Sequence, residues 1–501
     1  MKIKTSDLIK QKMAKYLKLF KTHTQYETYI NGQDAVKPNV SYCEDDNGVH
    51  YNPIRDYGKE YLTTVALENG TITFTPQNSN VISYSTDNGN TWTAGNSVTV
   101  ESGDEVIWKG TMTPQQYNGI GAFSSTCNFD AQGNVMSLLY GDDFKNQLSL
   151  EGKDYTFYNL FRGATHLISA ENLSLHATTL ANNCYVYMFY GCTSLTSAPQ
   201  LPATTLTQYC YDGMFYNCTS LISTPKLLAT TMATYCCQNM FRGCTGLTTA
   251  PQLNATTLAD SCYREMFNGC TSLTTAPQLP ATTLAQSCYF SMFYGCTSLT
   301  TVPQLLATTL ANSCYDNMFR DCTSLTTAPQ LPATTLANSC YDNMFYGCTN
   351  LTSAPQLPAM SLADSCYNSM FAYCTSLTYA PQLPAMTLAN NCYNSMFSNC
   401  TSLTSVPQLP AMTLADSCYI SMFWNCTSLT SAPELLATTL ASGCYSNMFH
   451  SCTSLTEVAI VPNSVKPVSS NYCSQMYVGT NVPRSSDYAE EAWSNSGGSN
   501  D

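Results

Sequence analysis

Apolar and polar positions recur along this chain in an order that repeats every 26 residues. The unit reads C-Y-x-x-M-F-x-x-C-T-S-L-T-x-A-P-Q-L-P-A-T-T-L-A-x-x, and its first cysteine returns eleven times between Cys184 and Cys444. A fixed period of this length is typical of a solenoid, in which each copy buries its apolar side chains against its neighbours. The pattern therefore predicts a repeat solenoid over residues 156–480.

The two ends of the repeat region depart from the unit. Residues 155–167 mimic it with Leu in place of Met and Ala in place of the second Cys, and residues 473–477 are a last partial copy. Solenoids need atypical terminal copies, because a regular copy would leave an apolar face open to water. Beyond Pro483 the chain turns polar and rich in Gly and Ser, so residues 481–501 are predicted to be a flexible tail.

The segment before the repeats has a different character. Between residues 59 and 112, short runs of β-branched and aromatic residues are separated by Asn, Gly and Asp. These runs predict short strands joined by tight turns, and together they predict a small Ig-like β-sandwich over 59–112. Residues 113–155, with turns expected at Gly119 and Gly133, are predicted to be a connector.

One motif lies inside this strand-rich segment. Residues 85–92 read S-T-D-N-G-N-T-W and resemble the Asp-box, S-x-D-x-G-x-T-W, of sialidase-type propellers. In that family the box is a hairpin turn, with Asp capping the turn, Gly at positive φ and Trp packed beneath. A single copy cannot make a propeller, and no cluster of arginines is present for a sialic carboxylate. We therefore interpret the motif as a hairpin and do not infer a glycosidase.

The N-terminal segment is basic. Residues 2–21 contain seven Lys and one Asp, and their apolar residues fall at helical spacing, which predicts a basic amphipathic helix. The helix could dock on its own protein or a neighbouring subunit, or bind a membrane surface. Docking is favoured, because a single short helix binds membranes weakly. With the arm that follows it, this helix would form an anchoring segment over 1–58. No signal peptide and no run of 18 apolar residues is found, so no membrane span is expected.

The composition narrows the possible functions. Only 11% of the residues are charged and the formal net charge is −13, which argues against nucleic-acid binding. The Thr, Ser, Asn and Gln of the repeats are typical of extracellular or particle-surface proteins. Most of the 26 cysteines occupy the two repeat positions, where buried free thiols are favoured over disulfides. Metal binding is the least favoured alternative, because C-x7-C is not a zinc spacing. No cofactor is expected.

A few positions vary between copies, namely the residue after Phe and the pair before Met. Equivalent positions of a solenoid stack into a stripe along one edge. If these sites merely tolerated any residue, Lys, Glu, Ser and Thr should dominate, but Tyr, Trp, Arg, Asn and His are frequent, as in binding hot spots. The candidate stripe consists of Tyr190, Tyr216, Arg242, Asn268, Tyr294, Arg320, Tyr346, Trp424, His450, Tyr187, Arg264 and Phe290.

We find no motif that indicates catalysis. His is scarce, and no G-x-S-x-G, H-E-x-x-H or Gly-rich phosphate loop is present. Acidic pairs such as Asp142-Asp143 are more typical of turns and solvated faces than of acid/base pairs. We therefore expect a binding protein without catalytic or metal-binding residues.

Two segments of the repeat match a known pattern. The spacing L-x-x-A-P-x-L-P from Leu195, and Met188-Phe189-x-x-Cys192-x-x-Leu195, resemble the L-x-x-I-x-I-P and A-F-x-x-C-x-x-L of BspA-like leucine-rich repeats. The resemblance covers residues 156–480. It implies a mixed α/β solenoid of parallel β-strands, the first over Ser194–Ala198, with Cys-Tyr-x-x-Met-Phe as a short helical turn. The period of 26 and the Ala-Pro pair depart from the family pattern and leave the strand length open.

A second resemblance concerns the leader. Residues 24–53, TQYETYINGQDAVKPNVSYCEDDNGVHYNP, look like the N-terminal leader of structural proteins from crAss-like and related phages of gut Bacteroidetes. This implies a virion component, made in the host cytoplasm and released by lysis.

The first functional hypothesis is accordingly a phage fibre or decoration protein. Residues 1–58 would bind other virion proteins, and the solenoid would recognise a host-surface glycan or protein. A homo-oligomer is expected, with a trimer as the guess, although no coiled-coil heptad specifies it. The alternative is a bacterial BspA-like cell-surface adhesin. A carbohydrate-active enzyme is the third and least favoured hypothesis, since it depends on one Asp-box.

Overall fold

The computed structural model describes residues 40–45, 48–53, 56–77 and 80–494, and the chain divides into two compact units, Met1–Glu60 and Tyr61–Asp501. In the first unit, β1 (Val40–Asp45) and β2 (Gly48–Pro53) form an antiparallel hairpin. A short 3-10 helix, η1 (Tyr57–Lys59), follows. The basic helix predicted for residues 2–21 lies outside the described residues.

The second unit begins with strands and continues into the repeats. Its strands are β3 (Leu62–Ala66), β4 (Gly70–Pro76), β5 (Ile82–Ser85), β6 (Thr93–Ala94), β7 (Ser97–Val100), β8 (Glu105–Gly110), β9 (Gly121–Ser125), β10 (Phe129–Asn134), β11 (Leu167–Ser169) and β12 (Leu173–Ser174). Its helices are α3 (Ser137–Tyr140), η2 (Gly141–Asn146), η3 (Asn463–Val465), α4 (Ser470–Cys473) and η4 (Glu490–Ala492).

The strands make two sheets that share one core. The larger has the order β11-β10-β3-β8-β5-β6, with β12 also paired to β10, and the smaller has the order β7-β4-β9. Trp108 from the larger sheet packs edge-to-face on Phe123 from the smaller, with ring centroids 5.4 Å apart. Both rings are almost fully buried. An Ig-like class for this region stays a prediction.

The segment expected to be a connector, 113–155, contains two of these strands. β9 pairs with β4 in the smaller sheet, and β10 pairs with β3 in the larger. The strands form here because Phe123 and Phe129 point apolar rings into the shared core, where both are buried. The prediction of a connector was therefore wrong for residues 121–134, since both sheets depend on them.

The Asp-box hairpin is confirmed. β5 and β6 pair antiparallel on either side of it, with Tyr84 opposite Thr93. Asp87 Oδ1 accepts hydrogen bonds from Ser85 Oγ at 2.6 Å and from the Thr91 N–H at 2.9 Å. These bonds lower the pKa of Asp87 to about 2. Gly89 has a φ of 85°, which an L side chain would disfavour.

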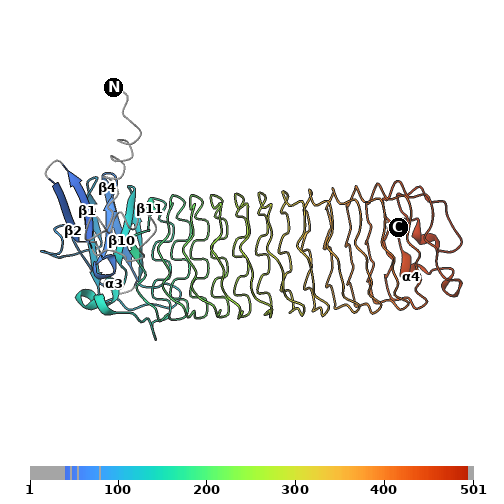
Figure 1. Ribbon diagram of the computed structural model, residues 1–501, viewed down its shortest axis with the longest axis horizontal. Coiled ribbons are helices and arrows are strands. Elements are labelled where there is room, and N and C mark those ends of the chain that lie inside the picture. The colour runs from blue at the N-terminus through green and yellow to red at the C-terminus, as the bar shows by residue number, and fades with distance from the viewer. Residues whose placement is uncertain (1–39, 46–47, 54–55, 78–79, 495–501) are drawn as a thin grey trace, which may run out of the picture. The chain divides into compact units, whose positions relative to one another are not determined.

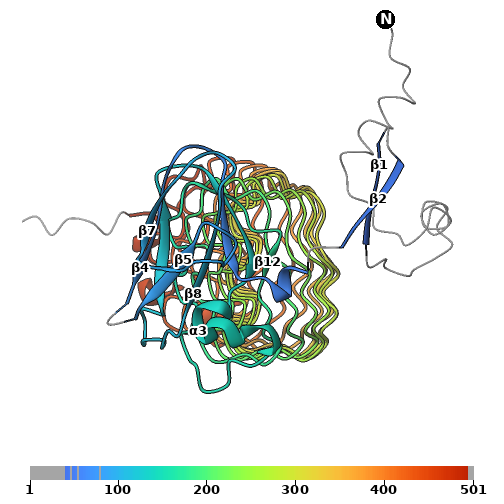
Figure 2. The ribbon, with the colours of Figure 1, turned by 90° about the vertical axis from the view of Figure 1, so that its left-hand side faces the viewer.

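The repeats form stacked coils, each beginning again at an equivalent place after 26 residues (Figure 1). Viewed along the stack, successive coils overlie one another (Figure 2). Within the Cys-to-Cys segment, every second N–H donates to a carbonyl of the next coil, as from Tyr185 N to Cys210 O at 3.1 Å. The intervening N–H groups donate three residues back, as from Met188 N to Tyr185 O at 3.2 Å. Each coil is thus bonded to the next along this whole segment.

This segment is a run of tight turns and not the predicted helical turn. Three residues in each coil have left-handed backbone, for example Ser287, Ser291 and Gly295 with φ of 52°, 51° and 69°. An α-helix cannot continue through such residues. Ser, Asn, Asp and Gly occupy most of these places, because they tolerate positive φ better than bulky residues.

The predicted strand over Ser194–Ala198 is reduced to isolated parallel bridges. Ser169 bridges to Ser197 and Thr249 bridges to Thr275, and the bridges do not extend along the coil. Pro199 lacks an N–H, so a ladder cannot continue past it. The Ala-Pro pair therefore limits the strand, and the inter-coil hydrogen bonds gather in the Cys-to-Cys turns.

Buried aromatic rings stack in columns inside the coils. The Phe rings from Phe161 to Phe449 follow one another at centroid distances of 5.3–5.8 Å and at interplanar angles of 8° or less. A parallel column of Tyr rings is interrupted where Cys237 replaces Tyr. Removing one such ring would cost about 3–5 kcal/mol, so the columns contribute strongly to stability.

The cysteines complete the core. The thiol of the second repeat cysteine donates to the Phe carbonyl of the preceding coil, as from Cys322 Sγ to Phe293 O at 3.1 Å. The same contact recurs in every coil from Cys192 to Cys452. The 25 cysteines from Cys127 to Cys473 are buried and unbonded to one another, so the predicted burial of these thiols is confirmed. Burial raises the pKa of Cys296 to about 12.

Different structures cover the two ends of the stack. At the N-terminal end, β11 and β12 pair in parallel with β10, and Phe161 stacks on Phe123 of the smaller sheet at 5.2 Å. At the C-terminal end, Tyr477 stacks on Phe449 at 5.8 Å and Trp493 stacks on Tyr477 at 5.3 Å. Side chains from outside the regular coils therefore cover both ends of the core.

The predicted flexible tail was wrong for residues 481–494. Tyr488 is buried, and its hydroxyl donates to Ala459 O at 2.8 Å. Tyr488 and Trp493 also pack edge-to-face at 6.2 Å. The polar composition of this segment did not indicate that these two aromatic side chains pack against the last coil.

The buried thiols should resist alkylation in the folded protein. At pH 8, a thiol with a pKa near 12 has well under about one thiolate in a thousand molecules, and burial also excludes the reagent. We expect iodoacetamide to leave the second repeat cysteines, from Cys192 to Cys452, unlabelled in buffer and to label them in urea, as measured by peptide mass spectrometry. Rapid labelling of repeat cysteines without urea would contradict this packing.

Candidate binding surface

The coils bring the predicted stripe residues to the surface in register. Nine of the twelve follow the buried Phe of their coil. The Phe ring enters the core, while the N–H of the next residue closes a turn onto the carbonyl three residues back, as from Tyr190 N to Tyr187 O at 3.1 Å. All twelve side chains are partly or fully exposed, and Trp424 is 38% exposed.

The stripe begins with two tyrosine side chains between two arginines. The guanidinium of Arg162 lies 4.8 Å from the centroid of Tyr190, which stacks on Tyr216 at 4.9 Å and 20°. Arg242 lies 5.4 Å from Tyr216 on its other side. Arg242 also pairs with the carboxylate of Glu265. Cation–π contacts of this kind contribute about 0.5–1 kcal/mol each at exposed sites.

A second run of stacked side chains lies in the middle coils, beyond Asn268. Arg320 lies between two tyrosines, 5.6 Å from the centroid of Tyr294 and 4.2 Å from that of Tyr346. Tyr346 packs in turn on Tyr373 at 5.0 Å. Cations and rings therefore stack along several successive coils, and each side chain holds its neighbour in place.

The other predicted members join this stack from its edge. Asn268 donates to Glu265 at 3.4 Å. Arg264 lies 4.0 Å from the centroid of Phe290, in the neighbouring column, and also pairs with Glu265 at 3.3 Å. Tyr187 packs edge-to-face on Tyr190 at 5.6 Å.

Trp424 and His450 form a separate pair near the C-terminal end. Trp424 Nε1 donates to His450 Nδ1 at 2.8 Å, so Nδ1 must be unprotonated. Burial lowers the pKa of His450, which agrees with a neutral ring. Ala372 and Ser398 occupy the stripe position between this pair and the rest and interrupt the stack.

Two stripe residues were missed from the sequence. Arg162 follows Phe161 in the atypical first copy, so the same rule would have found it. Tyr373 comes one position after the stripe position, at a φ of 62°. Its ring reaches Tyr346 across the place that Ala372 leaves open, which no spacing rule predicts.

Acidic side chains follow Arg264 and Phe290 at the same repeat position in the next two coils. Asp316 Oδ1 accepts from Asn317 Nδ2 at 2.5 Å, and Asp342 Oδ1 accepts from Asn343 Nδ2 at 2.7 Å and Asn368 Nδ2 at 3.1 Å. Burial raises the pKa of Asp316 to about 7, with Asp342 adding to the shift and Arg264 and Arg320 opposing it. Burial likewise raises the pKa of Asp342 to about 6.

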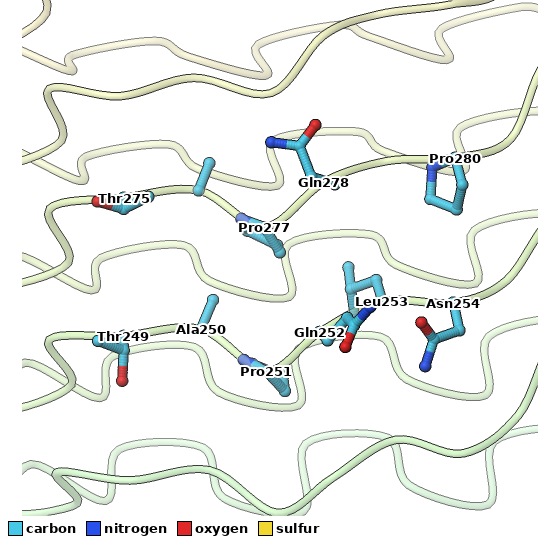
Figure 3. A pocket seen from close by; sticks show the side chains of 11 residues that line it. Thr249, Ala250, Pro251, Gln252, Leu253, Asn254, Thr275, Pro277, Gln278 and Pro280 are labelled. Atoms are coloured by element: carbon cyan, nitrogen blue, oxygen red, sulfur yellow. The ribbon is translucent and has the colours of Figure 1, made fainter.

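A groove of about 530 Å³ lies elsewhere, between two neighbouring coils (Figure 3). Its walls are residues 249–254 and, in the next coil, 275–278 and 280, with Pro251 and Pro277 in register. Thr, Gln, Pro, Ala, Leu and Asn line it, without a charged or aromatic side chain. We assign it no ligand, because it offers few directed contacts.

Metal sites and membrane spans are two further features to consider in the described residues. In those residues, no group of three or more His, Cys, Asp or Glu side chains gathers where it could hold a metal ion. No helix in the described part of the chain has the length and apolar character needed to cross a membrane.

The coils, their fixed period and their capped ends define a leucine-rich-repeat type of solenoid. Residues 168–277, 254–378, 286–430 and 364–486 each match the family described as BspA type leucine rich repeat region (6 copies). Together these stretches span more than half of the chain, which therefore belongs to the BspA-type leucine-rich-repeat family.

Other comparisons add little. No curated protein matches the chain. One solved structure that matches is described as the crystal structure of a TLR13-ssRNA13 complex, at 12% identity and a TM-score of 0.25. The match covers 63% of this chain and 51%, about half, of the other. At this TM-score the likeness supports no argument about fold or ligand.

The buried carboxylates should make stability depend on pH. Their folded pKa values lie above the ordinary value near 3.9, so the folded chain binds more protons than the unfolded chain between about pH 4 and 7. The free energy of unfolding should fall as the pH rises through this range, by several kcal/mol for Asp316 and Asp342 together, since each pKa unit corresponds to about 1.4 kcal/mol. The double variant Asp316→Asn, Asp342→Asn should lose this dependence and melt at a higher temperature at pH 8.

Asp364→Asn is the matched control. Asp364 is exposed and accepts from Asn390 N at 3.0 Å, and an amide oxygen can accept the same bond. Thermal melts followed by circular dichroism at pH 5 and pH 8 would compare the three proteins. An equal pH dependence in all three would contradict the role of the buried pair.

Proposed function

We propose that this chain is a surface-recognition protein of adhesin type, and that the stripe is its contact surface. The observation that supports this best is the stack of arginine and tyrosine side chains over successive coils. Tyr, Trp and Arg are the residues that dominate binding hot spots, because they offer large contact areas and directed polar groups. Residues at one repeat position need not stack in this way to fold a solenoid.

The stack also favours binding through its rigidity. Arg320 is held between Tyr294 and Tyr346, so little side-chain freedom is left to lose when a ligand binds. The partly exposed tyrosine rings and guanidinium groups suit an extended ligand, such as a surface glycan or a protein. The competing explanation is that the stack only stabilises neighbouring coils.

The function is binding without catalysis in this proposal. Asp316 and Asp342 are held by Asn amides, and the repeat thiols are buried, with the pKa of Cys296 raised, so neither set offers an exposed nucleophile or an acid/base pair. The solenoid would act by presenting an extended surface to its ligand.

Two settings are compatible with this function. Membership of the BspA-type family supports a bacterial cell-surface adhesin. The resemblance of residues 24–53 to phage leaders supports display on a virion, as a fibre or decoration protein that binds other virion proteins through residues 1–58. The family match begins at residue 168, so the virion setting depends on the leader alone. A homo-oligomer, such as a trimer, belongs to the same hypothesis.

Substitution of the stripe should separate recognition from folding. We expect Tyr294→Ser, Arg320→Ser, Tyr346→Ser and Trp424→Ser, combined in the full chain, to reduce binding to intact gut Bacteroidetes cells at least ten-fold. The thermal midpoint should change little, because these side chains are partly exposed. The control replaces four exposed glutamines of another part of the coil with Ser, at Gln278, Gln304, Gln330 and Gln356. Unchanged cell binding by the stripe variant would overturn the stripe as the contact surface.

Removal of the leader should decide between the two settings. If residues 1–58 anchor the protein in a virion, a chain that lacks them should fail to enter phage particles while it still binds cells. The measurement is immunoblotting of purified particles from a phage that encodes each form. Normal incorporation of the truncated chain would contradict the anchoring role.

A further inference from the structure

A second groove, of about 490 Å³, lies where the first coils meet the loop before them. It is lined by Gln116 and Tyr117 of this loop and by residues of three consecutive coils. Gly119 brings the loop close, since a Cβ there would lie 2.5 Å from Tyr158 O. Its volume falls in the range of about 300–1,000 Å³ that is usual for small-molecule sites.

Tyrosine rings dominate this groove. Tyr117 packs edge-to-face on Tyr155 at 5.0 Å, Tyr155 packs on Tyr158 at 5.9 Å, and Tyr158 packs edge-to-face on Tyr187 at 6.0 Å. Tyr209 of the third coil completes the wall. Edge-to-face packing turns neighbouring rings to different directions, so the groove offers ring faces as well as hydroxyl groups.

The backbone indicates that these tyrosines are not placed for stability. Tyr117, Tyr155, Tyr187 and Tyr209 have φ of 63°, 62°, 54° and 56°. A non-glycine residue in this region costs about 1–2 kcal/mol, and a bulky one is unusual.

Other coils avoid bulky residues at the equivalent places. In later coils, the place of Tyr155 and Tyr209 is taken by residues such as Ser261 and Ser287, and that of Tyr187 by Ser291, all at positive φ, whereas Tyr235 keeps a tyrosine in the coil between. Strained residues of this kind gather at ligand sites. Of the six tyrosines with positive φ in the described chain, four line this one groove.

Polar groups complete the lining. Asp212 is only 6% exposed, and its carboxylate accepts from Asn239 Nδ2 at 3.4 Å. Burial raises the pKa of Asp212 to about 7, so the carboxyl group can donate or accept near neutral pH. The side chains of Asn182 and Gln208 add amide donors and acceptors at the rim.

The charges of the groove exclude anionic ligands. No Lys or Arg is among its lining residues, while Asp154 and Asp212 are. A phosphate, sulfate or uronate would therefore meet acidic groups without a cation to pair with. A lipid chain would leave the carboxyl and amide groups without partners, which is costly.

We propose that this groove binds a neutral saccharide, with pyranose rings stacked on the tyrosine faces and their hydroxyls hydrogen-bonded to Asp212 and the rim amides. Sugars combine apolar C–H faces with hydroxyls that both donate and accept, and this lining offers both. The inference rests on the proposed recognition function and names a ligand class for it. Tyr187 also packs on Tyr190, so the groove is continuous with the stripe.

The test uses the full chain and defined neutral probes. Maltohexaose, cellohexaose and mannohexaose would be titrated by calorimetry and ligand-observed NMR, with hexagalacturonate as the anionic counterpart. We expect at least one neutral hexasaccharide to bind and hexagalacturonate not to bind. The variant Tyr155→Ser, Tyr209→Ser should weaken binding at least ten-fold. It should keep its fold, because serine already occupies the equivalent place in later coils.

Two further variants make the result specific. Asp212→Ala should weaken the same binding, since it removes the carboxyl oxygens that would bond to the sugar hydroxyls. Tyr373→Ser is the control, because it removes a tyrosine at positive φ outside the groove, and it should bind like the unchanged protein. Failure of all three neutral probes to bind, equal binding by Tyr155→Ser, Tyr209→Ser, or preference for hexagalacturonate would each overturn the proposal.

The outcome is distinguishable from that of the recognition function. The stripe substitutions at Tyr294, Arg320, Tyr346 and Trp424 lie outside the groove and should leave saccharide titration unchanged. If the stripe variant loses cell binding but still binds the saccharide, the groove is a saccharide site but is not the main contact with cells. Cell binding by a protein that binds no neutral probe would overturn the saccharide site and leave recognition standing.

Discussion

The inter-coil hydrogen bonds of the Cys-to-Cys turns are the constraint on which the structure depends. Every second N–H in this segment donates to the next coil, as from Phe319 N to Met344 O at 2.9 Å. This requires three left-handed residues per coil, which return the chain to the same direction after every fourth residue. The coils are thereby held close enough for Phe rings to stack and for each second thiol to reach a carbonyl of the preceding coil. An extended β-ladder, which usually supplies such bonds in a solenoid, is prevented here by proline.

The same constraint creates the surfaces. Successive coils lie about as far apart as two stacked aromatic rings. A side chain at a surface position therefore contacts the side chain at the same position one coil away. Arginine and tyrosine in that position become a stack, as Arg320 does between Tyr294 and Tyr346. At the N-terminal end, the loop at Tyr117 adds a wall that the later coils lack, so a groove forms there and the stripe continues from it. The same backbone arrangement therefore produces both the stripe and the groove.

Particular residues show how far the sequence could lead. The period, the buried Cys, Phe and Leu positions and the exposure of the stripe follow from spacing alone, because identical coils must bury identical positions. The strand over Ser194–Ala198 and the helical turn did not follow, since both were taken from a family whose repeat lacks the Ala-Pro pair. Residues 121–134 and 488–493 looked like connector and tail. Their aromatic side chains are buried by residues far away in the sequence, and local composition does not indicate such contacts.

The sequence by itself determined that this is a capped solenoid, where its core lies and which positions reach the surface. This was possible because each position of a 26-residue repeat packs against the same position in the neighbouring copies. Only the tertiary structure decided which surface residues touch. Arg162 joins the stripe from the cap, Tyr373 reaches across the gap at Ala372, and Tyr117 meets Tyr155 from a loop outside the repeats. These contacts join residues from non-equivalent positions, so their geometry depends on how the cap and the coils pack in space.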